Sequence, residues 1–168
     1  NQLRYGDSVR VRTWVKNIRQ SLSKRAYEFY RERDGELVAR ADTNWAFIDT
    51  TSGKPARISP EFMEAFRPDD TPVESFRIGI PNPSPGPDAQ THRRRVEWSD
   101  IDPAQHVNNS VYLAYSEDCA VEAVTACGWP PARMREHGFS MRMFECRIEY
   151  RVPTVLGDEL TVTTWLSS

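Results

Sequence analysis

A short polar run ahead of a long apolar segment carries the groups best suited to chemistry in this chain. It holds the carboxylate of Asp102, the imidazole of His106 and the asparagine pair Asn108 and Asn109. Asparagine is a preferred residue at a helix start, where the first backbone N–H groups have no partner inside the helix. A carboxylate, an imidazole and such N–H groups within reach of one point can polarise a carbonyl group and promote its attack. We therefore expect a catalytic site at this helix start.

The segment that follows is predicted to be one long helix, residues 109–127. It is apolar nearly all the way round, which favours a helix covered on most of its sides. Gly128 and the two prolines after it are typical of a helix end. Strands are predicted on either side of this helix, at residues 93–98, 141–151 and 159–166.

The front of the chain is predicted to be an antiparallel meander. Alternating valines from residue 9 to 15, an aromatic-rich run over residues 26–33 and a third run over residues 37–47 have the period of two that half-buried strands show. Asp34-Gly35 between the last two runs is typical of a tight hairpin turn. Residues 60–66 are compatible with a short helix.

Two strand segments resemble each other. Residues 6–15 and residues 157–166 both open with Gly-Asp, and both contain Thr-Trp followed by an aliphatic residue. Chance similarity between strands is one explanation. We favour two copies of one unit, with the back half of the first at residues 1–67, a Pro-rich linker at residues 68–91 and the front half of the second at residues 92–168.

Composition limits the partners of the chain. A formal net charge of −2 argues against a nucleic-acid binder, and no apolar run approaches a membrane span, so we expect neither nucleic acid nor membrane as partner. Residues 1–33 nevertheless hold nine Lys and Arg against three acidic residues. These charges either fill the solvent face of exposed strands or form a docking surface for an acidic partner.

The cysteines indicate a reducing compartment. Three cysteines, Cys119, Cys127 and Cys146, are an odd number without CxxC spacing, so free thiols in the cytoplasm are favoured over a disulfide framework or a zinc site. The sequence has no metal-ligand cluster and no glycine-rich phosphate loop, and we expect no metal and no cofactor.

The motifs in this order resemble the hot-dog-fold thioesterases. The spelling from Asp102 to Asn109 is close to the second hot-dog repeat of plant-type thioesterases that act on acyl-acyl carrier protein (acyl-ACP), and Asp-Pro-Ala is also similar to the 4-hydroxybenzoyl-CoA thioesterase branch. Residues 34–49 resemble the last strands of a hot-dog unit. The resemblance implies an α+β fold in which an antiparallel sheet wraps around one long central helix, with units paired in tandem or as a homo-oligomer.

The same resemblance implies a cofactor-free acyl-thioester hydrolase of fatty-acid and lipid metabolism that releases an acyl group from ACP or CoA. It implies a nucleophile or general base at Asp102 and a positioning or proton-transfer role for His106. Some hot-dog thioesterases carry a carboxylate on the central helix, which makes Glu117 a second candidate unless it faces solvent. The expected catalytic residues are Asp102, His106, Asn108 and Glu117, and the expected substrate-binding residues are Val107, Asn109, Ser110 and Tyr112.

Each assignment has a structural alternative. Asp102 can stabilise an Asp-Pro turn, and the asparagines can be helix caps only. Ala104 stands where plant-type enzymes have Asn, and Val152-Pro153 replaces an acidic residue, which favours the rival function of a non-catalytic hot-dog module for binding or assembly. The two halves can combine as one permuted unit, be completed by another chain, or belong to a longer protein, which we favour.

Overall fold

The computed structural model describes residues 3–66, 68–69 and 84–166. Most of the predicted Pro-rich linker, residues 70–83, lies outside the described residues. The chain divides into two compact units, Asn1–Arg77 and Ile78–Ser168.

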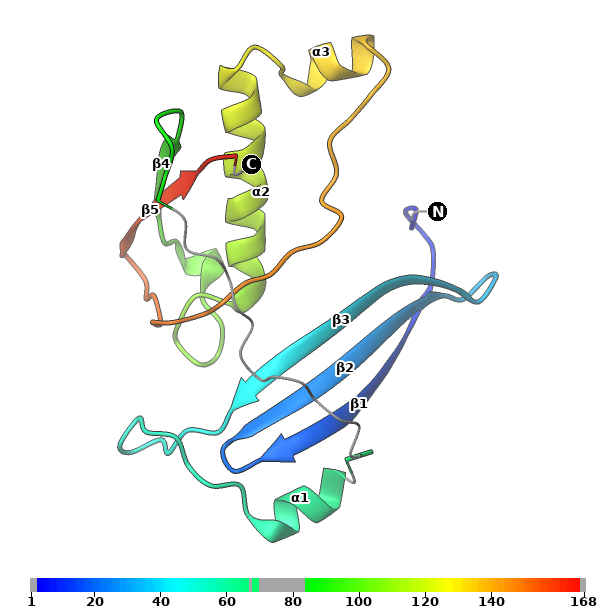
Figure 1. Cartoon of the computed structure of the whole chain (residues 1–168), viewed down its shortest axis with the longest axis vertical. Helices are drawn as coiled ribbons and strands as arrows, with labels where there is room; N and C mark the ends of the chain where they lie inside the picture. Colours follow the sequence, from blue (N-terminus) through cyan, green and yellow to red (C-terminus); the bar gives the residue numbers. More distant parts are fainter. Residues whose placement is uncertain (1–2, 67, 70–83, 167–168) are drawn as a thin grey trace. The chain divides into compact units, whose positions relative to one another are not determined.

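The first unit is a three-stranded antiparallel sheet with one short helix. Its strands are β1 (Val9–Arg19), β2 (Leu22–Arg31) and β3 (Glu36–Ala46), in the spatial order β1-β2-β3, and α1 (Pro60–Phe66) follows. The predicted meander is confirmed (Figure 1), as are the hairpin turn at Gly35, whose φ is 69°, and the short helix. Strand β2 begins earlier than predicted. The prediction missed its first residues because Ser-Lys-Arg there does not alternate apolar with polar residues.

Aromatic rings fix α1 against one end of this sheet. The rings of Phe47 and Phe62 lie 5.0 Å apart edge to face, and Phe62 and Phe66 lie 4.6 Å apart. Val15 and Ala26 are among the buried residues of the sheet. The sheet and α1 therefore enclose an apolar region between them.

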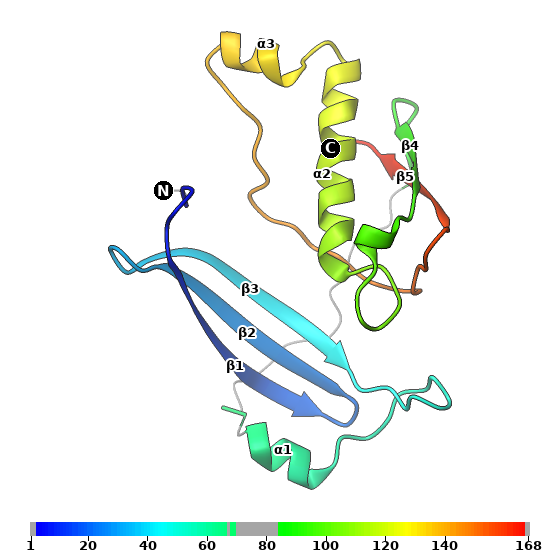
Figure 2. The ribbon, with the colours of Figure 1, turned by 180° about the vertical axis from the view of Figure 1, so that it is seen from behind.

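The second unit combines a two-stranded antiparallel sheet with a long helix. Figures 1 and 2 show the sheet beside this helix in both views. The elements, in chain order, are β4 (Gln90–Arg95), the 3₁₀ turn η1 (Trp98–Asp100), α2 (Asn109–Ala126), α3 (Pro131–Glu136) and β5 (Glu159–Thr164). The predicted helix and the last strand are confirmed, with ends within two residues of those expected.

Two predictions for this unit are wrong. The helix α2 is not covered on most sides within the described residues, because a sheet of two short strands contacts one face and buries only Tyr115 and Cys119. No strand forms at residues 141–151. A strand is defined by hydrogen bonds to a neighbour, and the described residues offer this segment none.

The two Gly-Asp turns share one geometry. Gly6 and Gly157 both have a φ of 88°, in the left-handed region that glycine adopts readily. The carboxylate of Asp7 accepts a hydrogen bond from the N–H of Arg4 at 2.8 Å, and Asp158 accepts one from Val155 at 2.9 Å. The sequence repeat is therefore also a repeat of local structure.

All three cysteines are free. Cys119 is buried as its apolar surroundings predict, whereas Cys127, which also lies in an apolar run, is exposed, as is Cys146. Within the described ranges, no helix combines the length and apolarity needed to cross a membrane.

Candidate active site

The predicted catalytic residues lie in a tight loop between η1 and α2. The N–H of Asp102 donates to the carbonyl of His106 at 3.0 Å, and the N–H of Gln105 donates back to the carbonyl of Asp102 at 2.9 Å. Gln105 has a φ of 65°, a left-handed conformation that reverses the chain within a few residues. Asp102 and His106 are thereby brought together at the start of α2.

The carboxylate of Asp102 is partly committed to the loop. Its Oδ1 accepts a hydrogen bond from the N–H of Ala104 at 2.8 Å and lies 3.7 Å from Nδ1 of His106. That separation allows an electrostatic contact but is too long for a hydrogen bond. Oδ2 has no hydrogen-bond partner among the described residues, so one carboxylate oxygen is available for chemistry.

The backbone selects the tautomer of His106. Its Nδ1 lies 3.1 Å from the carbonyl oxygen of Val107, which can only accept a hydrogen bond. We infer that Nδ1 carries the proton in the neutral ring and that Nε2 presents its lone pair. The side chain is 36% exposed, so Nε2 can meet a water molecule or substrate.

Asn108 caps α2. Its Oδ1 accepts hydrogen bonds from the N–H of Ser110 at 2.9 Å and from the hydroxyl of Ser110 at 2.7 Å. Its carbonyl accepts from Val111 at 2.9 Å. The helix therefore starts as the sequence predicts, and the side chain of Asn108 is occupied by the cap.

Most N–H groups expected to hold the substrate oxygen are already used. Val107 donates to Thr154 and Asn108 donates to Asp100, each at 2.8 Å, while Ser110 donates to the cap. Within the described ranges only the N–H of Asn109 has no acceptor in this group. One N–H, rather than four, is left to face a developing negative charge.

The other predicted residues serve different contacts. Val107 is only 1% exposed and belongs to the core. The hydroxyl of Tyr112 donates to that of Thr154 at 2.8 Å. Glu117 is exposed and makes no ion pair or hydrogen bond with a described residue, as the solvent alternative anticipated.

Asp100, which the sequence favours as the structural one of the two carboxylates, has that role here, but sequence reasoning missed its contact with Tyr115. Oδ2 of Asp100 accepts from the N–H of Glu97 at 2.8 Å and from the hydroxyl of Tyr115 at 2.7 Å. Burial, reinforced by the hydrogen bond to the Asp100 carboxylate, raises the pKa of Tyr115 to about 12. The only signal in the sequence is a tyrosine among the apolar residues of the helix.

Replacing Tyr115 with Phe is expected to flatten the loss of stability at high pH. Because the pKa of Tyr115 is raised from 10.0 to about 12, its contribution is complete below pH 10 and is lost as the pH rises towards 12. The part lost between pH 9 and pH 11 is expected to be about 1.4 kcal/mol, which corresponds to one pKa unit of the shift. Denaturant unfolding at pH 9 and pH 11 measures it, with the exposed Tyr5→Phe as control. Equal pH dependence in wild type and Tyr115→Phe would contradict the assignment.

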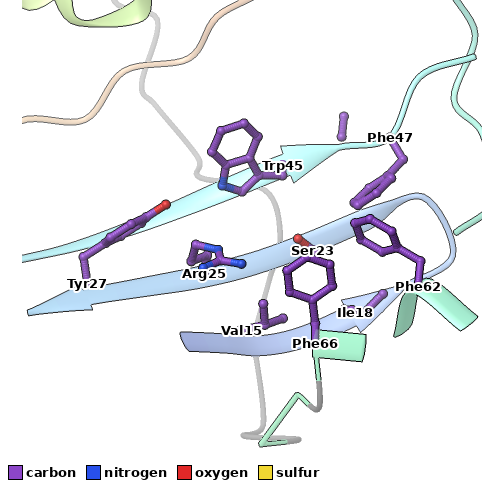
Figure 3. A pocket seen from close by; sticks show the side chains of 10 residues that line it. Val15, Ile18, Ser23, Arg25, Tyr27, Trp45, Phe47, Phe62 and Phe66 are labelled. Atoms are coloured by element: carbon purple, nitrogen blue, oxygen red, sulfur yellow. The ribbon is translucent and has the colours of Figure 1, made fainter. Parts of the chain in front are cut away.

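The first unit holds an open hollow between its sheet and α1 (Figure 3). Its volume is about 470 Å³, and Figure 3 shows aromatic rings from β3 and α1 around it. The guanidinium of Arg25 lies 5.5 Å from the ring centre of Phe66. The lining residues are apolar or aromatic apart from Ser23, Arg25 and the hydroxyl of Tyr27.

The residues that the structure describes contain no group of three or more His, Cys, Asp or Glu side chains arranged to hold a metal ion.

Family models match both parts of the chain. The acyl-ACP thioesterase N-terminal domain matches residues 1–66, and the thioesterase-like superfamily matches residues 96–168. The chain is 25% identical over 164 residues to a chloroplastic palmitoyl-acyl carrier protein thioesterase of Gossypium hirsutum, covering 95% of this chain and 38% of that protein. It is 28% identical over 116 residues to the chloroplastic acyl-[acyl-carrier-protein] hydrolase FATB2 of Cuphea viscosissima. That match covers 66% of this chain and 28% of that protein.

The fold has solved counterparts. A crystal structure of an acyl-ACP thioesterase from Bacteroides thetaiotaomicron superposes with a TM-score of 0.58 at 22% identity, covering 90% of this chain and 55% of that one. The predicted α+β hot-dog fold class is confirmed, and so is the resemblance to acyl-ACP thioesterases. The chain spans 28% and 38% of the length of the two plant relatives.

Proposed function

We propose that this chain, which has the hot-dog fold and resembles acyl-ACP thioesterases in both of its units, is the acyl-thioester hydrolase part of a protein that releases acyl groups from ACP. The observation that carries the proposal is the loop before α2. There Oδ2 of Asp102, Nε2 of His106 and the N–H of Asn109 lack partners among the described residues, within one tightly hydrogen-bonded segment.

These three groups supply what thioester hydrolysis requires. Asp102 attacks the carbonyl carbon itself or removes a proton from an attacking water. The N–H of Asn109 donates to the carbonyl oxygen as negative charge develops on it. The C–S bond then breaks, and the departing sulfur takes up the proton that Asp102 removed from the water. Where Asp102 itself attacks, the sulfur takes a proton from solvent, and water then hydrolyses the acyl–Asp102 anhydride to release the acid and restore the carboxylate. Nε2 of His106 orients the water or shares in that proton transfer.

The remaining predicted residues support this machinery. We assign Asn108 and Ser110 to the helix cap that presents the N–H of Asn109, and Val107 to the buried anchor of the loop. Tyr112 braces the helix through Thr154. Glu117 remains the second carboxylate to test, because it is exposed on α2 and unengaged by any described residue.

The hollow of the first unit is suited to an apolar ligand. A hollow of about 470 Å³ with aromatic walls can shelter a hydrocarbon chain from water. Each buried methylene contributes about 0.8 kcal/mol to binding. Acyl groups are therefore a better match to this hollow than polar ligands.

The two-unit organisation supports a tandem protein. We propose that residues 1–67 and 92–168 are halves of two hot-dog units joined by the linker at residues 68–91. The shared geometry of the Gly6-Asp7 and Gly157-Asp158 turns supports this reading. We also place the protein in the cytoplasm, since the exposed thiols of Cys127 and Cys146 suit a reducing compartment.

Acyl-ACP is expected to be hydrolysed in preference to acyl-CoA at low salt. ACP is acidic, and β1 exposes Arg10 and Arg12 to attract it. The preference is expected to shrink with added salt, because exposed charges are screened beyond about 8 Å at physiological ionic strength. Steady-state kcat/KM for both substrates across a salt series measures it.

A matched pair of variants locates the effect. Arg10→Gln with Arg12→Gln is expected to lower kcat/KM for acyl-ACP about tenfold at low salt. Arg135→Gln, an exposed arginine of the second unit, is expected to leave it unchanged. Identical salt responses for the two substrates would show that β1 is not a docking surface for ACP. Binding without hydrolysis would leave the non-catalytic module as the function.

A further inference from the structure

A cation lies among the aromatic walls of the hollow in the first unit. Ser23, Arg25 and Tyr27 alternate along β2, so their side chains project from the same face of the sheet and line the hollow together. Figure 3 shows Arg25 between the other two along this strand. A positive charge therefore faces a hollow whose lining is otherwise mostly apolar.

Arg25 has no carboxylate partner among the described residues. Its Nη1 donates to the hydroxyl of Thr13 at 3.3 Å, which is a long contact. By contrast, Lys16 in the same sheet pairs with the carboxylate of Asp42 at 3.0 Å. A guanidinium group presents five N–H donors, so most of those of Arg25 are available to bind an anion in the hollow.

The aromatic neighbour of Arg25 leaves these donors accessible. The guanidinium carbon lies over the ring of Phe66, 5.5 Å from its centre. An arginine that stacks on a ring keeps its N–H groups in the guanidinium plane, where they form paired hydrogen bonds with a planar carboxylate. The aromatic walls reduce the access of water to such a pair, which strengthens its hydrogen bonds.

The walls and the charge together define the ligand as an alkyl chain that ends in a carboxylate. The volume of about 470 Å³ lies within the range of small-molecule sites. A thioester or an alcohol with the same chain fits the walls equally well, but it brings no negative charge to Arg25. Charge complementarity therefore favours the free acid over its neutral derivatives.

We propose that the hollow of the first unit binds long-chain carboxylates, with the carboxylate on the guanidinium of Arg25 and the alkyl chain against the rings of Trp45, Phe47 and Phe62. The free acid is also the product of the hydrolysis proposed above, and identifying the natural ligand with that product rests on the proposed function. The binding itself does not, because it uses residues of the first unit alone.

Two probes with the same alkyl chain test the role of the head group. Decanoate and 1-decanol have equal chain lengths, but only decanoate is charged at pH 8. In calorimetric titrations, the full chain is expected to bind decanoate about tenfold or more tightly than decanol. Equal dissociation constants would overturn the proposal. They would leave the hollow as a site for neutral chains, which the proposed function allows.

Variants on β2 test whether the charge that matters is that of Arg25. Arg25→Gln is expected to raise the dissociation constant of decanoate about tenfold and to leave that of decanol unchanged. Lys24→Gln is the matched control, because Lys24 is the next residue on β2 and projects from the opposite face of the sheet. It is expected to bind both probes as the unmodified chain does. Circular dichroism checks folding. An unchanged affinity of Arg25→Gln for decanoate, or an equal loss in Lys24→Gln, would overturn the proposal.

Charge reversal tests the same contact through a gain of binding. Arg25→Glu is expected to lose affinity for decanoate and to bind decyltrimethylammonium about tenfold more tightly than the unmodified chain does, because the introduced carboxylate attracts a cationic head group. A folded Arg25→Glu variant without this gain would show that the head group of the ligand does not contact position 25.

Discussion

Replacing Asp102 with Asn is expected to lower kcat for acyl-ACP hydrolysis by about 10²–10⁴, the range for loss of a general base. The amide retains an oxygen that can accept the hydrogen bond from Ala104, which Asp102 now accepts at 2.8 Å. It lacks the charge and basicity that Oδ2 supplies. The melting temperature is therefore expected to change little while turnover collapses.

The comparison variants make this result specific. His106→Gln is expected to cost less than Asp102→Asn if His106 only orients water or substrate. Glu117→Gln is expected to leave kcat unchanged, since Glu117 is exposed. Near-wild-type turnover by Asp102→Asn, together with a large loss in Glu117→Gln, would transfer the chemistry to the helix carboxylate.

Replacing Asp100 with Ala is expected to lower the free energy of unfolding. This differs from the effect expected at Asp102, only two residues away, where turnover falls. Its carboxylate accepts hydrogen bonds from the N–H of Glu97 and from the hydroxyl of Tyr115, and Tyr115 is 9% exposed. Hydrogen bonds to a charged group contribute about 1.5–3 kcal/mol each. Because the Asp100 contacts are partly exposed, we reduce the sum of these contributions and expect a loss of about 2 kcal/mol in the free energy of unfolding.

Asp118→Ala provides the control for this loss. Asp118 is 58% exposed and pairs with Arg94 at 2.9 Å, and exposed ion pairs contribute about 0–1 kcal/mol. Urea denaturation of both variants separates the two cases. If Asp100→Ala were no less stable than Asp118→Ala, the Asp100–Tyr115 contact would not hold the loop.

The sequence was sufficient where local signals agree with each other. Asn108 supplies a cap, the apolar run supplies the helix, and Gly128 with its prolines ends it, so α2 was placed within one residue at its end. The same holds for the hairpin at Asp34-Gly35. Each signal acts through nearby residues, and no distant contact is needed to satisfy it.

The sequence was insufficient where the outcome depends on a distant neighbour. Residues 141–151 alternate as a strand does, but pairing requires a second strand that the described residues do not supply. The burial of α2 is lower than predicted for the same reason. Among the described residues, β4 and β5 contact only one face of the helix.

The division of labour between Asp100 and Asp102 was only partly predictable. Spacing alone does not reveal which carboxylate faces inward. Tyr115, a helix residue, commits Asp100 to the structure, and the left-handed Gln105 leaves one oxygen of Asp102 uncommitted. That positive φ at a non-glycine residue has no clear signature in the sequence.

Three phenol hydroxyls secure the first turns of α2: Tyr112 to Thr154, Tyr115 to Asp100 and Tyr150 to the carbonyl of Asn109. Helices ordinarily fray at both ends. Here the end beside the loop is braced from three directions, whereas the other end closes on an exposed Cys127. We therefore expect local opening of the helix to begin at the Cys127 end, where the cap consists of backbone hydrogen bonds from Cys127, Gly128 and Trp129. Because the three hydroxyl contacts lie at the start of α2, opening of its far end is expected to leave the spacing of Asp102, His106 and Asn109 unchanged.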